Sequence, residues 1–119
     1  MISIPEQIPL PQRFIQKLKH DMDIVNSYRI DDILFVILFG SCAKGNMTAA
    51  SDLDLMFVTE SKLDFHLAKE ITERLDDPVD EVSTDSVFYT LDELKNGQSR
   101  FTKEVLAHGK ILWKKQKLF

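Results

Sequence analysis

The apolar run Ile33–Phe39 (ILFVILF), closed by Gly40, limits the fold of this chain more than any other feature. The run is short and rich in β-branched and aromatic residues, so it predicts a strand that is buried on both faces. Spanning a membrane as a helix takes about 20 apolar residues. Because this run is the longest in the chain, the sequence also argues against a membrane protein.

Hydrophobic periodicity indicates the other elements. The predicted helices cover residues 11–28, 63–75, 91–95 and 99–108, and the predicted strands cover 33–39, 52–58 and part of 79–89. The inward stripe expected for the second helix is Phe65, Ala68, Ile71 and Leu75. An apolar turn is expected at 111–113. This order predicts an α/β fold of one domain, 1–119, in which helices flank a small mixed β-sheet after an extended lead-in over 1–10.

Charge and cysteine content narrow the classes of function. Fifteen basic and nineteen acidic residues give a formal net charge of −4, which argues against broad nucleic-acid binding, since that needs a net basic face. The single cysteine, Cys42, excludes an internal disulfide and a cysteine-based zinc site. It is typical of a reducing compartment, so we expect a cytoplasmic protein.

A Gly-Ser turn follows the predicted buried strand. Gly40 permits a tight turn and a close approach of the backbone to a ligand. Ser41 offers a hydroxyl and an amide beside what reads as a short helix starting at Cys42, and free amides at such a start bind phosphate. Lys44 adds a positive charge, and Gly45 ends the short helix before the next loop. We therefore expect a phosphate-binding turn.

Two carboxylates follow in the sequence Ser51-Asp52-Leu53-Asp54. Residues i and i+2 of a strand share a face, with Cα atoms roughly 6.5–7 Å apart. Carboxylates about 4 Å apart repel by roughly 4 kcal/mol at an effective dielectric of about 20, so a cation is expected between them. Magnesium favours one or two carboxylates plus substrate phosphates. The pair and the turn together predict metal-assisted phosphoryl or nucleotidyl transfer.

A third carboxylate is needed to complete a second ion site or to activate the incoming hydroxyl. Asp80, in the sequence Val79-Asp80-Glu81-Val82, is preferred because it falls on the predicted third strand, next to the second. Asp85 is the alternative.

The pattern Gly40-Ser41-x-Ala43-x-Gly45-x5-Ser51-Asp52-x-Asp54-Leu55 resembles the signature of the nucleotidyltransferase superfamily that includes DNA polymerase beta. The short chain is similar to its minimal members, including MntA-type antitoxins. The resemblance covers roughly residues 33–113 and implies a polymerase-beta-like nucleotidyltransferase fold. It implies nucleotide binding by Gly40, Ser41, Lys44 and Ser51, and two Mg²⁺ ions held by the catalytic residues Asp52, Asp54 and Asp80.

The resemblance also implies a reaction. A nucleoside monophosphate, with AMP from ATP the expected one, passes to a hydroxyl acceptor and pyrophosphate is released. The acceptor it suggests is a tyrosine of a small helical HEPN-type toxin, which the chain silences as the antitoxin. Because nearly all 119 residues are used by the catalytic core, we expect a second protein or a second copy of the chain to supply the acceptor site.

Two other functions are compatible with the residues. One is a non-catalytic module of the same fold that binds and masks a partner, although intact Ser51, Asp52 and Asp54 argue against it. The other is a nucleotidyltransferase for a sugar or aminoglycoside, which needs a homodimer to build the acceptor pocket.

Overall fold

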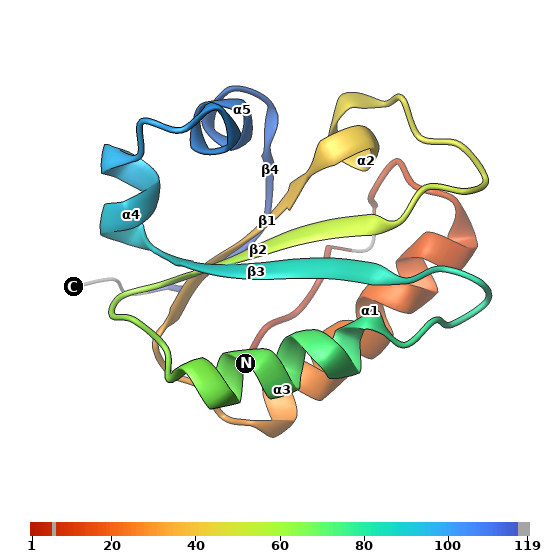
Figure 1. The fold of residues 1–119 in the computed structure, drawn as a ribbon. Helices are drawn as coiled ribbons and strands as arrows, with labels where there is room; N and C mark the ends of the chain where they lie inside the picture. Colours follow the sequence, from red (N-terminus) through yellow and green to blue (C-terminus); the bar gives the residue numbers. More distant parts are fainter. Residues whose placement is uncertain (6, 117–119) are drawn as a thin grey trace.

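A computed structural model, which describes residues 1–5 and 7–116, gives the architecture (Figure 1). The elements in chain order are α1 (Gln12–Ser27), β1 (Ile33–Phe39), α2 (Gly40–Lys44), β2 (Leu53–Thr59), α3 (Phe65–Asp76), β3 (Thr84–Thr90), α4 (Leu91–Asn96), α5 (Arg100–His108) and β4 (Lys110–Lys114). The strands of these residues form one sheet in the order β3-β2-β1-β4. β1 runs antiparallel to β2 and β4, whereas β2 and β3 are parallel. The predicted mixed sheet flanked by helices is confirmed.

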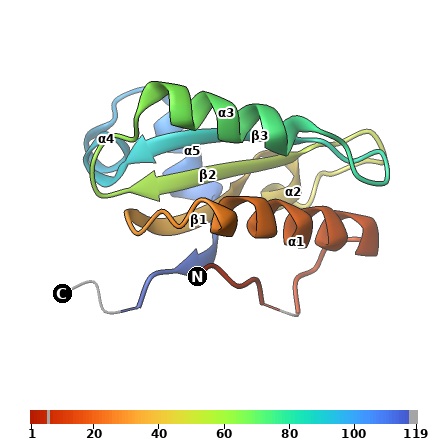
Figure 2. The same cartoon turned by 90° about the horizontal axis from the view of Figure 1, so that it is seen from below.

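Strand β1 lies inside the sheet, between β2 and β4, and has the predicted bounds. Figures 1 and 2 show α1 and α3 on one face of the sheet, and α4 and α5 on the other. Val36 and Leu38 pack into the core under α1 and α3, and Ile37 packs toward α4 and α5. The continuous apolar run is thus explained, because both faces of the strand are covered.

The two longer helices bury most of the apolar residues in the stripes that the sequence indicates. The α1 stripe includes Phe14, Leu18, Met22 and Val25, and that of α3 includes Ile71 and Leu75. Phe65 was expected in the second stripe, but it is 70% exposed. The reason is that Asp64 caps the helix by accepting a hydrogen bond from the amide of Leu67, so Phe65 is the first helical residue and faces solvent. Among the described residues, no helix has the length and apolar character needed to cross a membrane.

Two segments differ from the sequence prediction. The apolar turn expected at 111–113 is the strand β4, which hydrogen-bonds to the second edge of β1 and alternates exposed Ile111 with buried Leu112. The segment 79–82 is a tight turn and not part of a strand: Val79 and Val82 exchange backbone hydrogen bonds, each of 3.0 Å. Its two central residues have φ of 51° and 67°, the left-handed values of a two-residue hairpin turn.

Candidate active site

The Gly40 turn and the Asp54 carboxylate lie against each other. Gly40 has φ of 72°, and a Cβ at this position would overlap the carboxylate of Asp54. Only glycine therefore satisfies both the left-handed backbone and the close approach. Helix α2 begins at Gly40 itself, two residues before the predicted start at Cys42. The two motifs found in the sequence meet at the end of β1.

Ser41 and Ser51 are also brought together. The hydroxyl of Ser41 donates to Oγ of Ser51 at 3.3 Å, and the amide of Thr48 donates to the same oxygen at 2.8 Å. These bonds join α2 to the loop that leads into β2. The predicted nucleotide-binding residues Gly40, Ser41 and Ser51 thus line one stretch of surface beside the carboxylates.

Three carboxylates gather where β2 and β3 begin. Asp54 on β2 pairs in register with Asp85 on β3, and both point to the face covered by α4 and α5. Burial, together with the negative charges of Asp85 and Asp52, raises the pKa of Asp54 from its usual 3.8 to about 6. Within the described residues, none of the three forms an ion pair with a basic side chain. The cluster is therefore an uncompensated negative site.

Asp80 does not belong to this cluster. It is exposed in the turn that precedes β3, where its backbone oxygen accepts a hydrogen bond from Arg13 at 3.3 Å. The prediction that Asp80 lies on the third strand beside the second is wrong, because that strand starts at Thr84. Asp85, the alternative, occupies the position opposite Asp54. The signal for it is the β-branched and aromatic composition of residues 84–90, which marks the strand.

The donor set suits a hard divalent cation, although it is not a closed ligand set. No three carboxylate, histidine or cysteine side chains of residues 1–5 and 7–116 are grouped closely enough to hold a metal ion as they stand. However, Asp52, Asp54 and Asp85 offer only oxygen ligands, which Mg²⁺ prefers, and substrate phosphates commonly supply the rest of its shell. A cation relieves their mutual repulsion, which adds to burial in raising the pKa of Asp54.

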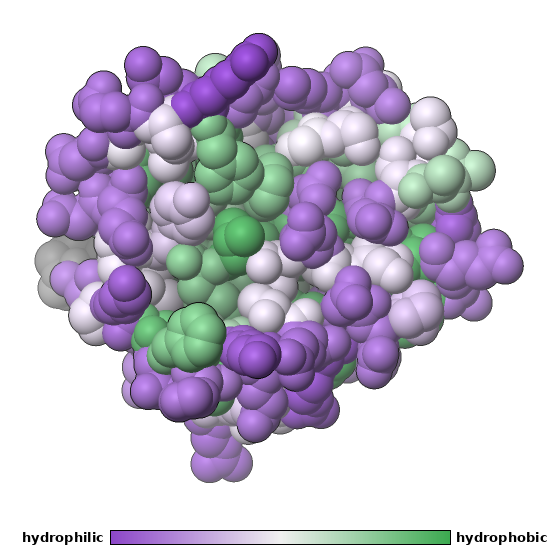
Figure 3. Space-filling view, in the orientation of Figure 1, coloured by the Kyte–Doolittle hydropathy of each residue, from purple (hydrophilic) through white to green (hydrophobic). Residues whose placement is uncertain are grey.

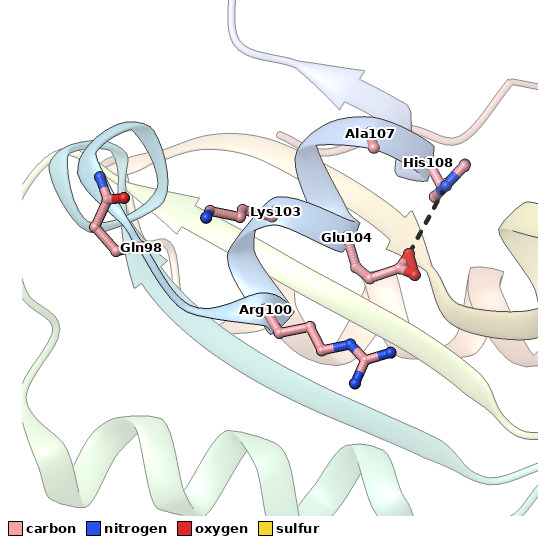
Figure 4. A pocket seen from close by; sticks show the side chains of 6 residues that line it. All are labelled: Gln98, Arg100, Lys103, Glu104, Ala107 and His108. Atoms are coloured by element: carbon pink, nitrogen blue, oxygen red, sulfur yellow. Dashed lines mark ion pairs between the residues drawn. The ribbon is translucent and has the colours of Figure 1, made fainter.

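Lys44 faces α5. Its Nζ pairs with Oε1 of Glu104 at 3.2 Å, and Oε2 of Glu104 lies 3.9 Å from Nε2 of His108. Lys44 and Glu104 line a groove of about 230 Å³ together with Gly40. Figure 4 shows Glu104 and His108 pointing toward each other along α5, with Arg100 and Lys103 beside them. Sequence reasoning missed Glu104, because its contact with Lys44 joins residues 60 positions apart.

The site opens onto an apolar strip of the sheet. In the orientation of Figure 1, Figure 3 shows apolar side chains gathered in the middle of the face, between α5 and α3, with polar groups around them. Phe39 packs edge-on against Phe101 at 5.2 Å between ring centroids, and Tyr89 lies 5.7 Å from Phe101. These rings are partly buried, so the acidic cluster is bordered by an apolar surface.

Cys42 lies next to the site, but its thiol is unreactive. Its side chain is buried, with the sulfur 3.5 Å from the backbone oxygen of Asp52. Burial, together with the negative charge of Asp54, raises the pKa of the thiol to about 11. Since the thiolate is the reactive form, Cys42 is not a nucleophile at neutral pH.

Solved structures share this fold. A toxin-antitoxin crystal structure with AMP-PNP is 23% identical with a TM-score of 0.59, over 85% of this chain and 73% of the other. A putative nucleotidyltransferase from Sulfolobus solfataricus is 18% identical with a TM-score of 0.58, over 93% and 96%. The toxin-antitoxin MntA-HepT is 20% identical with a TM-score of 0.56, over 86% and 74%. A comparison with curated proteins gives no match.

The sequence itself carries the family assignment. The family described as "Polymerase beta, Nucleotidyltransferase" matches residues 16–118. This match includes the Gly40 turn, the Asp52–Asp54 pair and strand β3 with Asp85. The predicted resemblance and the predicted enzyme class, a nucleotidyltransferase, are confirmed. The chain belongs to the polymerase beta nucleotidyltransferase family.

Proposed function

We propose that the chain transfers AMP from ATP to a hydroxyl group of a partner protein, and that Asp52, Asp54 and Asp85 are its catalytic carboxylates. The observation that carries this proposal is the in-register pairing of Asp54 with Asp85 at the point where Asp54 touches the Gly40 turn. A turn suited to phosphate and a cluster suited to a divalent cation then act on one substrate. Such a combination fits nucleotidyl transfer better than simple binding.

Each residue has a distinct task in the proposed reaction. The backbone at Gly40 and the hydroxyl of Ser41 hold the outer phosphates, while Ser51 keeps Ser41 in place through their 3.3 Å hydrogen bond. Asp52, Asp54 and Asp85 would hold Mg²⁺, which would supply positive charge to offset the triphosphate and the leaving pyrophosphate. We propose two ions, as the family resemblance implies. The exposed Asp85 accepts the proton of the attacking hydroxyl at one of its carboxylate oxygens.

Lys44 can bind the triphosphate only after its ion pair with Glu104 is broken. In the structure its charge is compensated by Glu104, and both side chains are more than a third exposed. Such a pair is worth about 0–1 kcal/mol, so a phosphate group can displace Glu104 at little cost. Lys44 then offsets part of the negative charge of the triphosphate.

The acceptor that we propose is a tyrosine of a small helical toxin of the HEPN type, with this chain as the antitoxin. Two of the similar folds are those of toxin-antitoxin structures, one of them with AMP-PNP. The apolar strip beside the carboxylates, formed in part by Phe39, Tyr89 and Phe101, is suited to contact such a partner. A cytoplasmic location, expected from the single cysteine, stays a prediction.

The test is transfer of label from ATP labelled at the α-phosphate, with Mg²⁺, to the product of a neighbouring gene. Asp80→Asn and Asp85→Asn form a matched pair, because the two positions are five residues apart and both side chains are exposed. We expect the wild type and Asp80→Asn to label the partner, and Asp85→Asn and Asp52→Asn to leave it unlabelled. Full labelling by Asp85→Asn contradicts the assignment.

Other results identify the alternative functions. Tight partner binding without label in any variant indicates a non-catalytic masking module. Label that appears on added aminoglycosides or sugars, together with a dimer in size-exclusion chromatography, indicates a small-molecule nucleotidyltransferase.

A further inference from the structure

Helix α1 directs a row of polar side chains toward the starts of β2 and β3. Arg13, Lys17 and Asp21 are spaced by four residues, so they lie one above another on the same helix face. Lys17 and Asp21 are both 0% exposed, and charged residues are rarely buried unless they are paired. The proposed reaction uses neither of them.

Lys17 and Asp21 form an ion pair that reaches two other elements. Nζ of Lys17 donates to Oδ1 of Asp21 at 2.6 Å and to the backbone oxygen of Leu75, near the end of α3, at 2.6 Å. The second carboxylate oxygen of Asp21 accepts a hydrogen bond from Oγ1 of Thr84 at 2.5 Å. Thr84 is the first residue of β3 and is 1% exposed. The pair thus joins α1 to the end of α3 and to the start of β3.

The bond to Thr84 is linked to the direction in which Asp85 points. Successive side chains of a strand point to opposite faces, so a Thr84 side chain held toward α1 directs Asp85 to the other face, beside Asp54. The backbone supports the same register, because Thr84 pairs with Leu53, and the amide of Leu53 donates to the oxygen of Ser83 at 3.0 Å. A slip of one residue turns Asp85 away from the cluster.

Arg13, one turn earlier on α1, joins the segments that precede the two strands. Its guanidinium donates to the backbone oxygen of Ala49 at 2.6 Å and to that of Asp80 at 3.3 Å. Ala49 lies in the loop that leads to Asp52, and Asp80 lies in the turn before β3. The same helix face therefore anchors the approaches to both carboxylate-bearing strands.

Stability alone does not account for the buried pair. Apolar residues of similar volume in place of a buried ion pair often leave a protein equally stable or more so. An apolar residue at position 21 cannot, however, accept the hydrogen bond of Thr84. We propose that Lys17, Asp21 and Thr84 are positioning residues, which hold Asp85 beside Asp54 and so raise the affinity of the carboxylate cluster for a divalent cation. The inference rests on the proposed function, because it takes the cluster to be the metal site.

The test is a titration of the full chain with Mn²⁺ in the absence of nucleotide, followed by the electron paramagnetic resonance signal of the free ion. Thr84→Val keeps the shape of the side chain but removes the hydroxyl, and Thr84→Ser restores the hydroxyl. Val58→Ala serves as the control, because it truncates a fully buried side chain at the far end of β2. We expect Thr84→Val to weaken Mn²⁺ binding about 10-fold, the lower end of the 10–100-fold effects of groups that orient metal ligands. Thr84→Ser and Val58→Ala stay within about two-fold of the wild type.

A second variant keeps the test decisive if Thr84→Val does not fold. The triple variant Lys17→Met/Asp21→Leu/Thr84→Val replaces all three polar groups by apolar ones, and we expect it to fold but to bind Mn²⁺ as weakly as Thr84→Val. If Thr84→Val or the triple variant folds and binds Mn²⁺ with unchanged affinity, the inference is overturned. The same holds if Val58→Ala loses as much affinity as Thr84→Val. Either result leaves the proposed function standing. If the wild-type protein binds no Mn²⁺ either without nucleotide or with ATP present, the proposed function fails as well.

Discussion

Replacing Asp54 with asparagine is expected to stabilise the protein in the absence of divalent cations, although Asp54 is a proposed catalytic residue. Asparagine keeps the shape of the side chain and so preserves its fit against Gly40. The substitution removes the negative charge of Asp54. This charge is unfavourable because the side chain is partly buried and lies near the carboxylates of Asp85 and Asp52. The fold thus carries an electrostatic cost that this single substitution relieves.

The magnitude follows from the pKa of Asp54, which is about 6 in the folded protein against a usual 3.8. Because the folded-state pKa is the higher one, ionisation of Asp54 opposes folding. The cost is absent below pH 3.8 and complete above about pH 6. The difference corresponds to roughly 3 kcal/mol, which solvent screening of a partly exposed group reduces to about 1–2 kcal/mol. For a chain of this length, that is a rise in Tm of roughly 3–8 °C.

Thermal unfolding followed by circular dichroism, with a chelator present, measures this effect. We expect Asp54→Asn to melt above the wild type at pH 8, with about half that gain at pH 5. Saturating Mg²⁺ reverses the order, because the wild type, with all three carboxylates, gains more from the bound ion. Asp23→Asn, which changes an exposed carboxylate on α1, is the control and leaves Tm unchanged. A lower Tm for Asp54→Asn at pH 8 in chelator refutes the reasoning.

Three further predictions concern the neighbourhood of the cluster. Gly40→Ala costs about 3–5 kcal/mol in the free energy of unfolding, because backbone strain and overlap with the side chain of Asp54 add to each other. Gly45→Ala has the same left-handed backbone but open space around it, so it costs only about 1–2 kcal/mol. Urea unfolding measures the difference, and equal costs contradict the close fit at Gly40. Glu104→Gln frees Lys44 from its 3.2 Å ion pair, so we expect it to tighten ATP binding about two- to five-fold, as measured by calorimetry. An unchanged or weaker affinity for ATP speaks against a role for Lys44. Cys42, with a pKa of about 11, reacts with a thiol reagent at pH 8 far more slowly in the native protein than in urea, and equal rates contradict its burial.

The strand β1, the Gly40 turn and the first two carboxylates could be predicted from the sequence, because they depend on patterns between residues that are close in the chain. The short length and β-branched content of the run Ile33–Phe39 favour a buried strand, and its bounds are as predicted. Asp52 and Asp54 are two positions apart at the start of the next strand, so their common face follows from strand geometry. Gly40 is likewise recognisable as the residue of a tight turn.

The third carboxylate needed information that a local pattern does not hold. The sequence Val79-Asp80-Glu81-Val82 suits a strand, but it equally suits a two-residue turn between paired valines, and the structure has the turn. Lys17 and Asp21 look like an ordinary i,i+4 pair on a solvated helix face. Asp21 also bonds to Thr84, 63 positions later, and no periodicity shows such a contact. The strand β4 was missed for a related reason, since its partner β1 lies far back in the chain.

The place of β4 has a consequence for synthesis on the ribosome. Phe35 pairs with Lys114, so one edge of the apolar strand β1 stays open until nearly all of the described chain has been made. An uncovered edge of a long apolar strand is a template for pairing with other chains. A chain that stops at Gly109 is therefore expected to collect in the insoluble fraction when it is expressed, and a soluble truncated product contradicts this. By pairing with the open edge of β1, strand β4 thus protects the newly made protein from aggregation.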